Sequence, residues 1–235
     1  LKDLGHKVPG MDIVLFSNIP DGAGLSSSAA LEVLMAYIIL YLENPEKIDR
    51  VEVAKLCQKV ENEFVGVNCG IMDQFAVAVG KKDHAILLDC ASLYYEYAPL
   101  NLGEYSLVIM STNKRRELAD SKYNERRAEC EKALAIINSN KERKLENLCQ
   151  ATLDDIEKFI TDETIKRRAV HVVSENERVK MSMEMLKNND ILGFGELLTA
   201  SHMSLEKDYE VSHVVVEHGE TSKRFDMLPA LYKAC

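Results

Sequence analysis

The sequence predicts an α+β protein, with strand signals concentrated in the first half and helical signals in the second. A short apolar run from Met11 to Ile19 ends at Pro20-Asp21-Gly22, which is typical of a strand that closes in a turn. The stretch from Ser26 to Leu42 carries one charge, Glu32, and predicts a helix that is buried nearly all round. From Tyr123 to Asp208 the apolar residues recur at helical spacing, so this part is expected to be mostly helical.

The remaining elements follow from shorter patterns. A second helix is expected from Arg50 to Phe64, with Asp49 and Glu52 forming a capping box at its start. Three further apolar or aromatic runs predict strands, at Ala85 to Leu88, Leu93 to Tyr97 and Leu107 to Met110. A soft domain boundary is expected between Tyr97 and Tyr105.

Composition excludes several classes of partner. The 235 residues include 29 Lys and Arg against 38 Asp and Glu, a net charge of −9, so no broad electrostatic surface for nucleic acid or anionic lipid is expected. No apolar run approaches the ~20 residues of a membrane span. The six cysteines lack the paired spacing of a zinc site, and we expect reduced thiols in a cytosolic protein.

The most informative stretch is the turn from Pro20 to Leu31, where a strand leads through glycines into a helix. Gly22 and Gly24 let a ligand approach the backbone closely, and Ser26-Ser27-Ser28 stands at a helix N-terminus, where N–H groups favour an anion. The turn holds no lysine and is neither a Gly-Lys-Ser/Thr loop nor a G-x-G-x-x-G turn. A serine that merely caps the helix is the alternative. Three serines beside two glycines favour phosphate binding.

Two carboxylates are candidates for the chemistry of phosphoryl transfer. Glu61 lies near the end of the second helix, and Asp73 stands between Met72 and Phe75, where an idle surface carboxylate is unexpected. Phosphoryl transfer needs a metal ligand and a group that orients or deprotonates the acceptor hydroxyl. Glu61 and Asp73 suit these two roles. For Asp73, a helix N-cap or a buried ion pair remains an equal alternative.

Taken together, these segments resemble the galactokinases, within the galactokinase, homoserine kinase, mevalonate kinase and phosphomevalonate kinase superfamily. The resemblance covers residues 1 to 212 and implies a two-lobed small-metabolite kinase fold. The lobes would span 1–100 and 101–212, with the N-terminal lobe incomplete and a non-matching tail at 213–235. The matching segments are Pro20 to Leu31, Glu61 to Phe75, Leu87 to Leu93, Ser111 to Asn113, Ser121 to Arg127, Ser201 to Leu205 and Asp208 to Ser212.

The resemblance also implies a reaction and a set of residue roles. ATP would phosphorylate the C1 hydroxyl of galactose, giving galactose 1-phosphate and ADP. Asp73 would face that hydroxyl as a base or as an orienting group, Ser28 and Glu61 would hold Mg²⁺, and Gly70, Asp73 and Tyr123 would bind the sugar. The ATP phosphates would be bound by Gly22, Ala23, Gly24, Leu25, Ser26, Ser27 and Ser28. The resemblance also implies a cytoplasmic enzyme. A monomer is expected, and the sequence does not fix the oligomeric state.

The sequence departs from the family at both ends. The family's first motif, a Gly-Arg-x-Asn-x-x-Gly-Glu-His-x-Asp stretch with an arginine beside the catalytic aspartate, has no counterpart, nor has its late glycine-rich motif. The chain begins with Leu1. We therefore expect a fragment that is inactive or weak on its own, with a sheet edge left unpaired. A kinase of another acceptor, a non-catalytic sensor of galactose and ATP, and a gene fragment without function are the alternatives.

Two basic clusters stand out in an acidic chain, at Lys114 to Arg116 and at Arg126-Arg127. Both are interpreted as solvated helix faces with glutamate partners, and attraction of ATP is the weaker reading.

Overall fold

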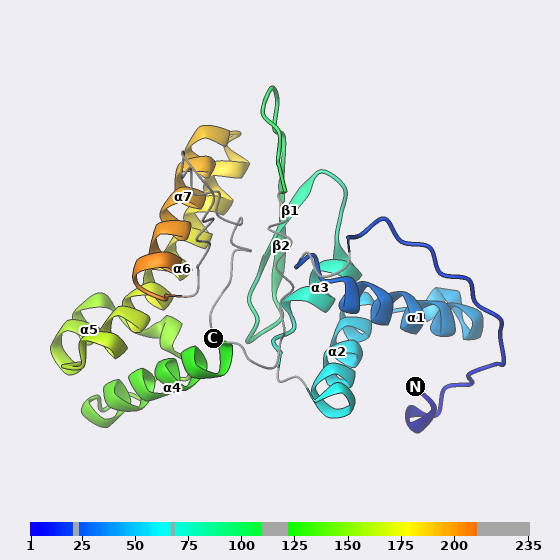
Figure 1. Cartoon of the computed structure of the whole chain (residues 1–235), viewed down its shortest axis with the longest axis horizontal. Helices are drawn as coiled ribbons and strands as arrows, with labels where there is room; N and C mark the ends of the chain where they lie inside the picture. The colour runs from blue at the N-terminus through cyan, green and yellow to red at the C-terminus, as the bar shows by residue number, and fades with distance from the viewer. Residues whose placement is uncertain (21–23, 67–68, 110–121, 211–235) are drawn as a thin grey trace, which may run out of the picture. The chain divides into compact units, whose positions relative to one another are not determined.

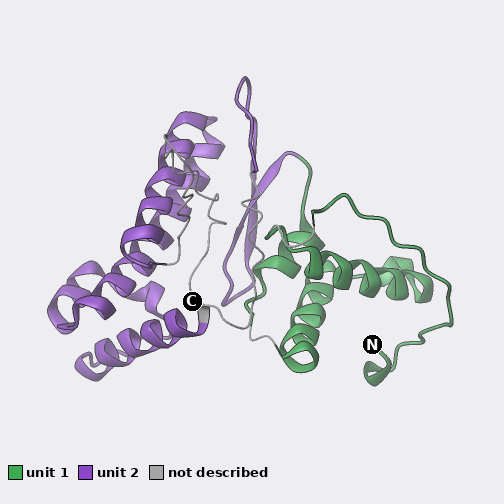
Figure 2. Cartoon of the chain, viewed as in Figure 1, with its two compact units in different colours: residues 1–82, 112–119 green, residues 83–111, 120–235 purple. Residues whose placement is uncertain are grey.

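The computed structural model describes residues 1–20, 24–66, 69–109 and 122–210, with residues 122 and 123 described in their backbone alone. These residues fall into two compact units that divide between Lys82 and Asp83 (Figure 2). The lobe boundaries expected from the family stay a prediction. Within the described ranges no helix is both long enough and apolar enough to cross a membrane.

Unit 1 is built from three helices that pack on one another: α1 (Ser27–Glu43), α2 (Arg50–Val60) and α3 (Met72–Val79) (Figure 1). Short 3-10 turns lie at Lys2–Leu4 and Pro45–Lys47, and a π-helical turn at Glu61–Val65. The predicted helix over Ser26 to Leu42 is confirmed, and its inner face buries Ala29, Val33, Ala36 and Ile39. These positions recur every three or four residues, as one helical face requires.

Two sequence expectations for unit 1 need correction. The run Met11 to Ile19 forms no strand, and its Val14 and Phe16 are 98% and 93% exposed. A strand needs a neighbour to satisfy its backbone, and the described residues place none beside this run. The second helix is α-helical up to Val60 and continues as the π turn. Its predicted cap is present, since Asp49 accepts from the amides of Val51 and Glu52.

Unit 2 begins with an antiparallel hairpin of β1 (His84–Leu88) and β2 (Tyr95–Pro99), in which Leu88 pairs with Tyr95. The strand predicted at Ala85 to Leu88 is confirmed. The second strand starts two residues later than predicted, because the turn includes Leu93, whose φ is 59°. The Asp89 carboxylate accepts from backbone amides of this turn. The strand predicted at Leu107 to Met110 is wrong over 107–109, where exposed residues have no strand partner among the described ones, and Met110 lies outside them.

Four helices form the rest of unit 2, in agreement with the helical spacing of the second half. They are α4 (Lys122–Asn140), α5 (Leu153–Phe159), α6 (Glu163–Lys187) and α7 (Ile191–Lys207), with a 3-10 turn at Leu148–Gln150. The long helix α6 contacts the other three, and its later turns contact both strands (Figure 1). The main apolar core lies among α4, α5 and α6 and includes Ile137, Ile156 and Val172, each at most 1% exposed.

The interface between α6 and α7 is polar although it is buried. His171 on α6 is 1% exposed, and its Nδ1 lies 3.0 Å from Oγ of Ser204 on α7. That hydroxyl donates in turn to Asp208 at 2.7 Å. Burial, together with the charges of Arg178 and Arg168, lowers the pKa of His171 to about 3. The imidazole is therefore neutral in the folded protein throughout the physiological range.

This neutral histidine predicts a loss of stability in acid. Below its ordinary pKa of 6.5, His171 takes up a proton in the unfolded chain but stays neutral in the folded one until about pH 3. The unfolding free energy should therefore decrease as the pH is lowered from 6.5 to about 3, and this residue should contribute up to about 1.4 kcal/mol per pH unit. His171→Gln should show a shallower fall in urea unfolding between pH 6.5 and pH 3. His202→Gln, on the neighbouring helix, serves as the control. Identical slopes for His171→Gln and the parent chain would contradict the assignment.

Candidate functional site

The glycine and serine turn leads directly into α1. Gly22 and Ala23 lie outside the described residues, and Gly24 follows them with a φ of 74°, which favours glycine. Leu25 and Ser28 are exposed, and Ser27 is half-buried. Ser26 is the N-cap residue with a φ of 56°, and its side chain makes no capping hydrogen bond. The simple reading in which the serine run caps the helix therefore fails at Ser26, since the side chain at the cap position does not cap.

A non-glycine residue with positive φ is uncommon and costs free energy that the surroundings must offset. Such residues cluster where the backbone is shaped around a ligand. Ser26 and Gly24 both have a positive φ, so the backbone before α1 has the conformation expected of a ligand-binding turn.

Three helical elements of unit 1 meet at a cluster of polar side chains. Glu32, one turn after Ser28 on α1, lies close enough to Glu61 of the π turn and to Gln74 of α3 for their side chains to interact. Glu61 is 7% exposed and Gln74 is 2% exposed. Burial and the Glu61 charge raise the pKa of Glu32 to about 7. Two carboxyl groups thus share one half-buried site, and their mutual repulsion is relieved when one is neutral or when a cation is near.

Two hydrogen bonds fasten the segment that leads into α3. The amide of Cys69 donates to the side-chain oxygen of Asn62 at 3.1 Å, and Nε2 of Gln58 donates to the carbonyl of Cys69 at 3.2 Å. Burial and the Glu61 charge raise the pKa of the Cys69 thiol, so it stays protonated. These contacts hold the chain before Gly70 against α2 and the π turn.

Asp73 lies in the first turn of α3, half-buried, where the helix dipole favours a carboxylate. The N-cap of this helix is Ile71, so Asp73 is not a capping residue. Among the described residues it forms no ion pair. The N-cap alternative for Asp73 is therefore wrong, and its role in the chemistry stays a prediction. Gly70, three residues earlier, is exposed, and a Cβ added there would meet no atom within 4 Å.

Within unit 1, Glu32 lies between two of the expected site residues, Ser28 and Glu61. Ser28 shares a helix face with Glu32, Glu32 contacts Glu61, and Gln74 is adjacent to Asp73 in sequence. Tyr123 belongs to α4 of unit 2, and its side chain lies outside the described part. The tail after Ser212 and the cluster Lys114 to Arg116 also lie outside it.

Glu32 and Gln74 are residues for which sequence reasoning named no role. The signal for Glu32 was its standing as the one charge in an otherwise apolar helix. Gln74 offered only its place beside Asp73, and its contact with Glu32 depends on how α3 packs against α1.

The residues present fit a magnesium ion. Oε2 of Glu32 and Oε1 of Gln74 are buried without a hydrogen-bond partner among the described residues, and the site holds two carboxyl groups. Mg²⁺ prefers carboxylate and hydroxyl oxygens and often takes only one or two carboxylates together with substrate phosphates. Within the described ranges no group of three or more His, Cys, Asp or Glu side chains is arranged to hold a metal. Glu61 and Ser28 as the ligands of such an ion stay a prediction.

Comparisons with known proteins show which proteins the chain is similar to. Residues 1–81 match the family described as GHMP kinases N terminal domain. A galactokinase of Clostridium tetani is 58% identical over 89% of this chain and 54% of its own length, and one of Fusobacterium nucleatum is 53% identical over the same shares. A solved structure, the galactokinase of Lactococcus lactis complexed with galactose, superposes with a TM-score of 0.76 at 43% identity, over 83% of this chain and 50% of that one.

The chain therefore has the GHMP kinase fold over the part that superposes, and residues 1–81 match the N-terminal domain of that class. Within the class it is similar to galactokinases over about nine tenths of its length, as the resemblance predicted. The chain spans about half the length of the curated relatives that it matches.

A pair of alanine substitutions tests whether the serine run is more than a helix cap. Asp49→Ala removes a working cap of α2 and should lower the unfolding free energy by about 1 kcal/mol. Ser26→Ala removes a side chain that makes no capping hydrogen bond and should change it by less than about 0.5 kcal/mol. Urea unfolding followed by circular dichroism measures both. A cost for Ser26→Ala equal to that of Asp49→Ala would restore the capping interpretation.

Proposed function

We propose that this chain is part of a galactokinase, an enzyme that transfers the γ-phosphoryl group of ATP to the C1 hydroxyl of galactose. The observation that carries the proposal is the contact of Glu32 with both Glu61 and Gln74. This contact joins the helix of the serine turn, the carboxylate suited to a metal and the helix of Asp73. A phosphoryl-transfer site needs these three parts together.

Each residue has a distinct task in the proposed reaction. The backbone of Gly22 to Ser28 binds the ATP phosphates, assisted by the N-terminal end of α1. Ser28 and Glu61 hold Mg²⁺, which neutralises negative charge on the phosphates when it is bound. Asp73 orients the C1 hydroxyl or accepts its proton as the new O–P bond forms and the bond to ADP breaks. Gly70 and Tyr123 contact the sugar. The product is galactose 1-phosphate.

The compartment and assembly belong to the same proposal. The cytoplasm supplies ATP and keeps thiols reduced, which agrees with the five free cysteines of the described residues. A monomer is the expected state.

The experiment combines thermal shift with ADP release on the 235-residue chain. Mg-ATP should raise the melting temperature of the parent chain. Glu61→Gln should remove most of the part of this shift that requires Mg²⁺, because an amide is a weaker ligand than a carboxylate. Glu63→Gln is the matched control, since Glu63 lies two residues away, is 68% exposed and pairs with Lys59. An unchanged shift in Glu61→Gln would contradict the metal assignment.

Turnover is tested on the same samples with galactose, N-acetylgalactosamine and mevalonate. Galactose-dependent ADP release should be weak in the parent chain and absent in Asp73→Ala. A better rate with either other acceptor would overturn the proposed substrate. Binding of galactose and Mg-ATP with no turnover under any condition would favour a sensor. Rapid turnover that Asp73→Ala abolishes would mean that the site is complete without the family motifs that this sequence lacks.

A further inference from the structure

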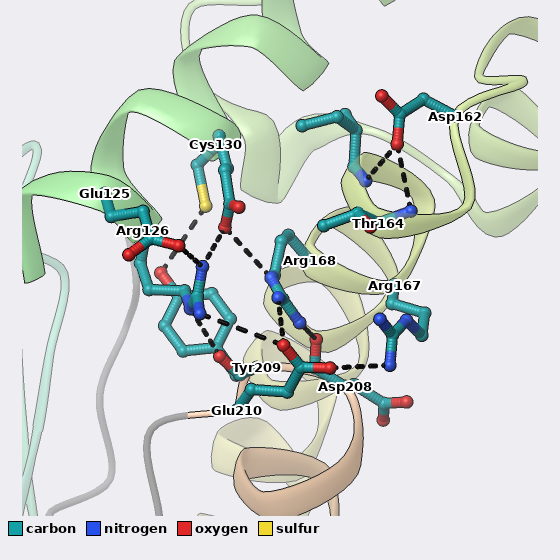
Figure 3. A network of polar contacts seen from close by, with 12 residues as sticks. Glu125, Arg126, Cys130, Asp162, Thr164, Arg167, Arg168, Asp208, Tyr209 and Glu210 are labelled. Carbon is teal, nitrogen blue, oxygen red and sulfur yellow. Dashed lines mark hydrogen bonds and ion pairs between the residues drawn. The ribbon is translucent and has the colours of Figure 1, made fainter. Parts of the chain in front are cut away.

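A second dense polar cluster lies in unit 2, where the start of α4, the first half of α6 and the end of α7 meet (Figure 3). Its two central arginines, Arg126 and Arg168, are 2% and 1% exposed. The expected solvated face is therefore wrong for Arg126, whereas its expected glutamate partners are present. Fully buried arginines are rare unless they are paired, so their partners decide what they do.

Arg126 joins α4 to the segment that follows α7. Its Nε donates to the carbonyl of Tyr209 at 2.6 Å, its Nη2 lies 3.9 Å from the Glu210 carboxylate, and its Nη1 pairs with Glu129 on the next turn of α4. Near it, Sγ of Cys130 lies 3.4 Å from the Tyr209 hydroxyl. The first turns of α4 are thus held to Tyr209 and Glu210.

Arg168 joins the same two elements from α6. It donates to Glu129 at 2.9 Å and to Glu210 at 2.6 Å, and its Nη1 donates to the Asp208 carbonyl. Burial opposes its charge, but the hydrogen bonds to Glu210 and Glu129 outweigh this and raise the pKa of Arg168. Glu129 therefore pairs with both buried arginines, and Glu210 pairs with both of them and with the exposed Arg167.

Such a network is a poor device for stability alone. A buried ion pair gains little over well-packed apolar side chains, because removing charges from water is costly. Its advantage is geometric, because a planar guanidinium binds its acceptors in fixed directions. The network also joins two of the segments that resemble the galactokinases, Ser121 to Arg127 and Asp208 to Ser212. The first holds Tyr123, one turn before Arg126.

We propose that Arg126 is a positioning residue, which fixes the start of α4, and with it Tyr123, by binding Tyr209 and Glu210. The proposal rests on the proposed function for its link to galactose. The proposal adds to that function a residue that does not touch the substrate. Arg126 acts through α4, the helix that carries the proposed sugar-contacting residue Tyr123.

The test compares neighbouring arginines. Arg126→Gln removes the buried guanidinium group. Arg127→Gln removes an arginine that is 47% exposed and pairs with Glu131 one turn along the helix. Amide hydrogen exchange on the 235-residue chain should show about tenfold or more faster exchange at residues 122–130 in Arg126→Gln, with residues 163–187 little changed. Arg127→Gln should resemble the parent. Arg126→Lys should fail to restore protection, because an ammonium lacks the fork.

A variant on the acceptor side guards against a failure to fold. Glu210 is 38% exposed, and Glu210→Gln weakens its contact with Arg126. The buried Arg126 still keeps its contacts with Glu129 and with the Tyr209 carbonyl in this variant. It should also loosen residues 122–130 selectively. Equal exchange in Arg126→Gln and Arg127→Gln, or a uniform increase over all helices of unit 2, would overturn the proposal.

The sugar is tested separately by thermal shift with increasing galactose and with increasing Mg-ATP. Arg126→Gln should raise the galactose concentration of half-maximal stabilisation and leave that of Mg-ATP unchanged, a split that general destabilisation would not produce. An equal change for both ligands would contradict a positioning role. If the parent chain does not respond to galactose, the proposed substrate fails, while the exchange data still decide whether Arg126 fixes α4.

Discussion

A charge removed from water must find a partner, and this constraint organises the polar interior of both units. In unit 2 it is met within the protein, because Arg126 and Arg168 are balanced by Glu129 and Glu210. In unit 1 it is met only in part, because Glu32 and Glu61 are both acidic and one of them must be neutral or accompanied by a cation. The arginine network is the one that we propose fixes helices, and the carboxyl cluster is the one that we propose accepts a cation with an anionic ligand.

The same contrast explains why the two clusters suit different tasks. The carboxyl cluster lies beside helix starts, at Ser28 on α1 and at Asp73 on α3, where the dipoles attract anions such as phosphates. The arginine network lies at helix junctions and has its donors occupied by carboxylates and carbonyls. A guanidinium so engaged is not free to attract ATP. The positive charges of this acidic chain are thus used to hold the fold, at least at this junction.

The sequence predicted elements well where burial follows a local period. The helix over Ser26 to Leu42 and the strand at Ala85 to Leu88 are set by patterns that hold within the segment itself. Met11 to Ile19 and Leu107 to Ile109 have equally apolar patterns and form no strand, because a strand exists only beside another strand. The aromatic pattern predicts a strand at Leu93 and Tyr94, but their amides donate to the preceding turn instead, Leu93 to the Asp89 carbonyl and Tyr94 to Oγ of Ser92.

By itself the sequence determined the family, the candidate phosphate turn and the candidate carboxylates Glu61 and Asp73, because these depend on residue types at fixed spacing. That Glu32 interacts with Glu61 and Gln74, and that Arg126 is buried while Arg127 is exposed, depends on the tertiary structure alone. The physical reason is the same in each case. A residue's chemistry is fixed by its side chain, but whether its charge is solvated, paired or near a like charge depends on groups far away in the chain. Arg126, for example, binds Tyr209, which is 83 residues later in the sequence.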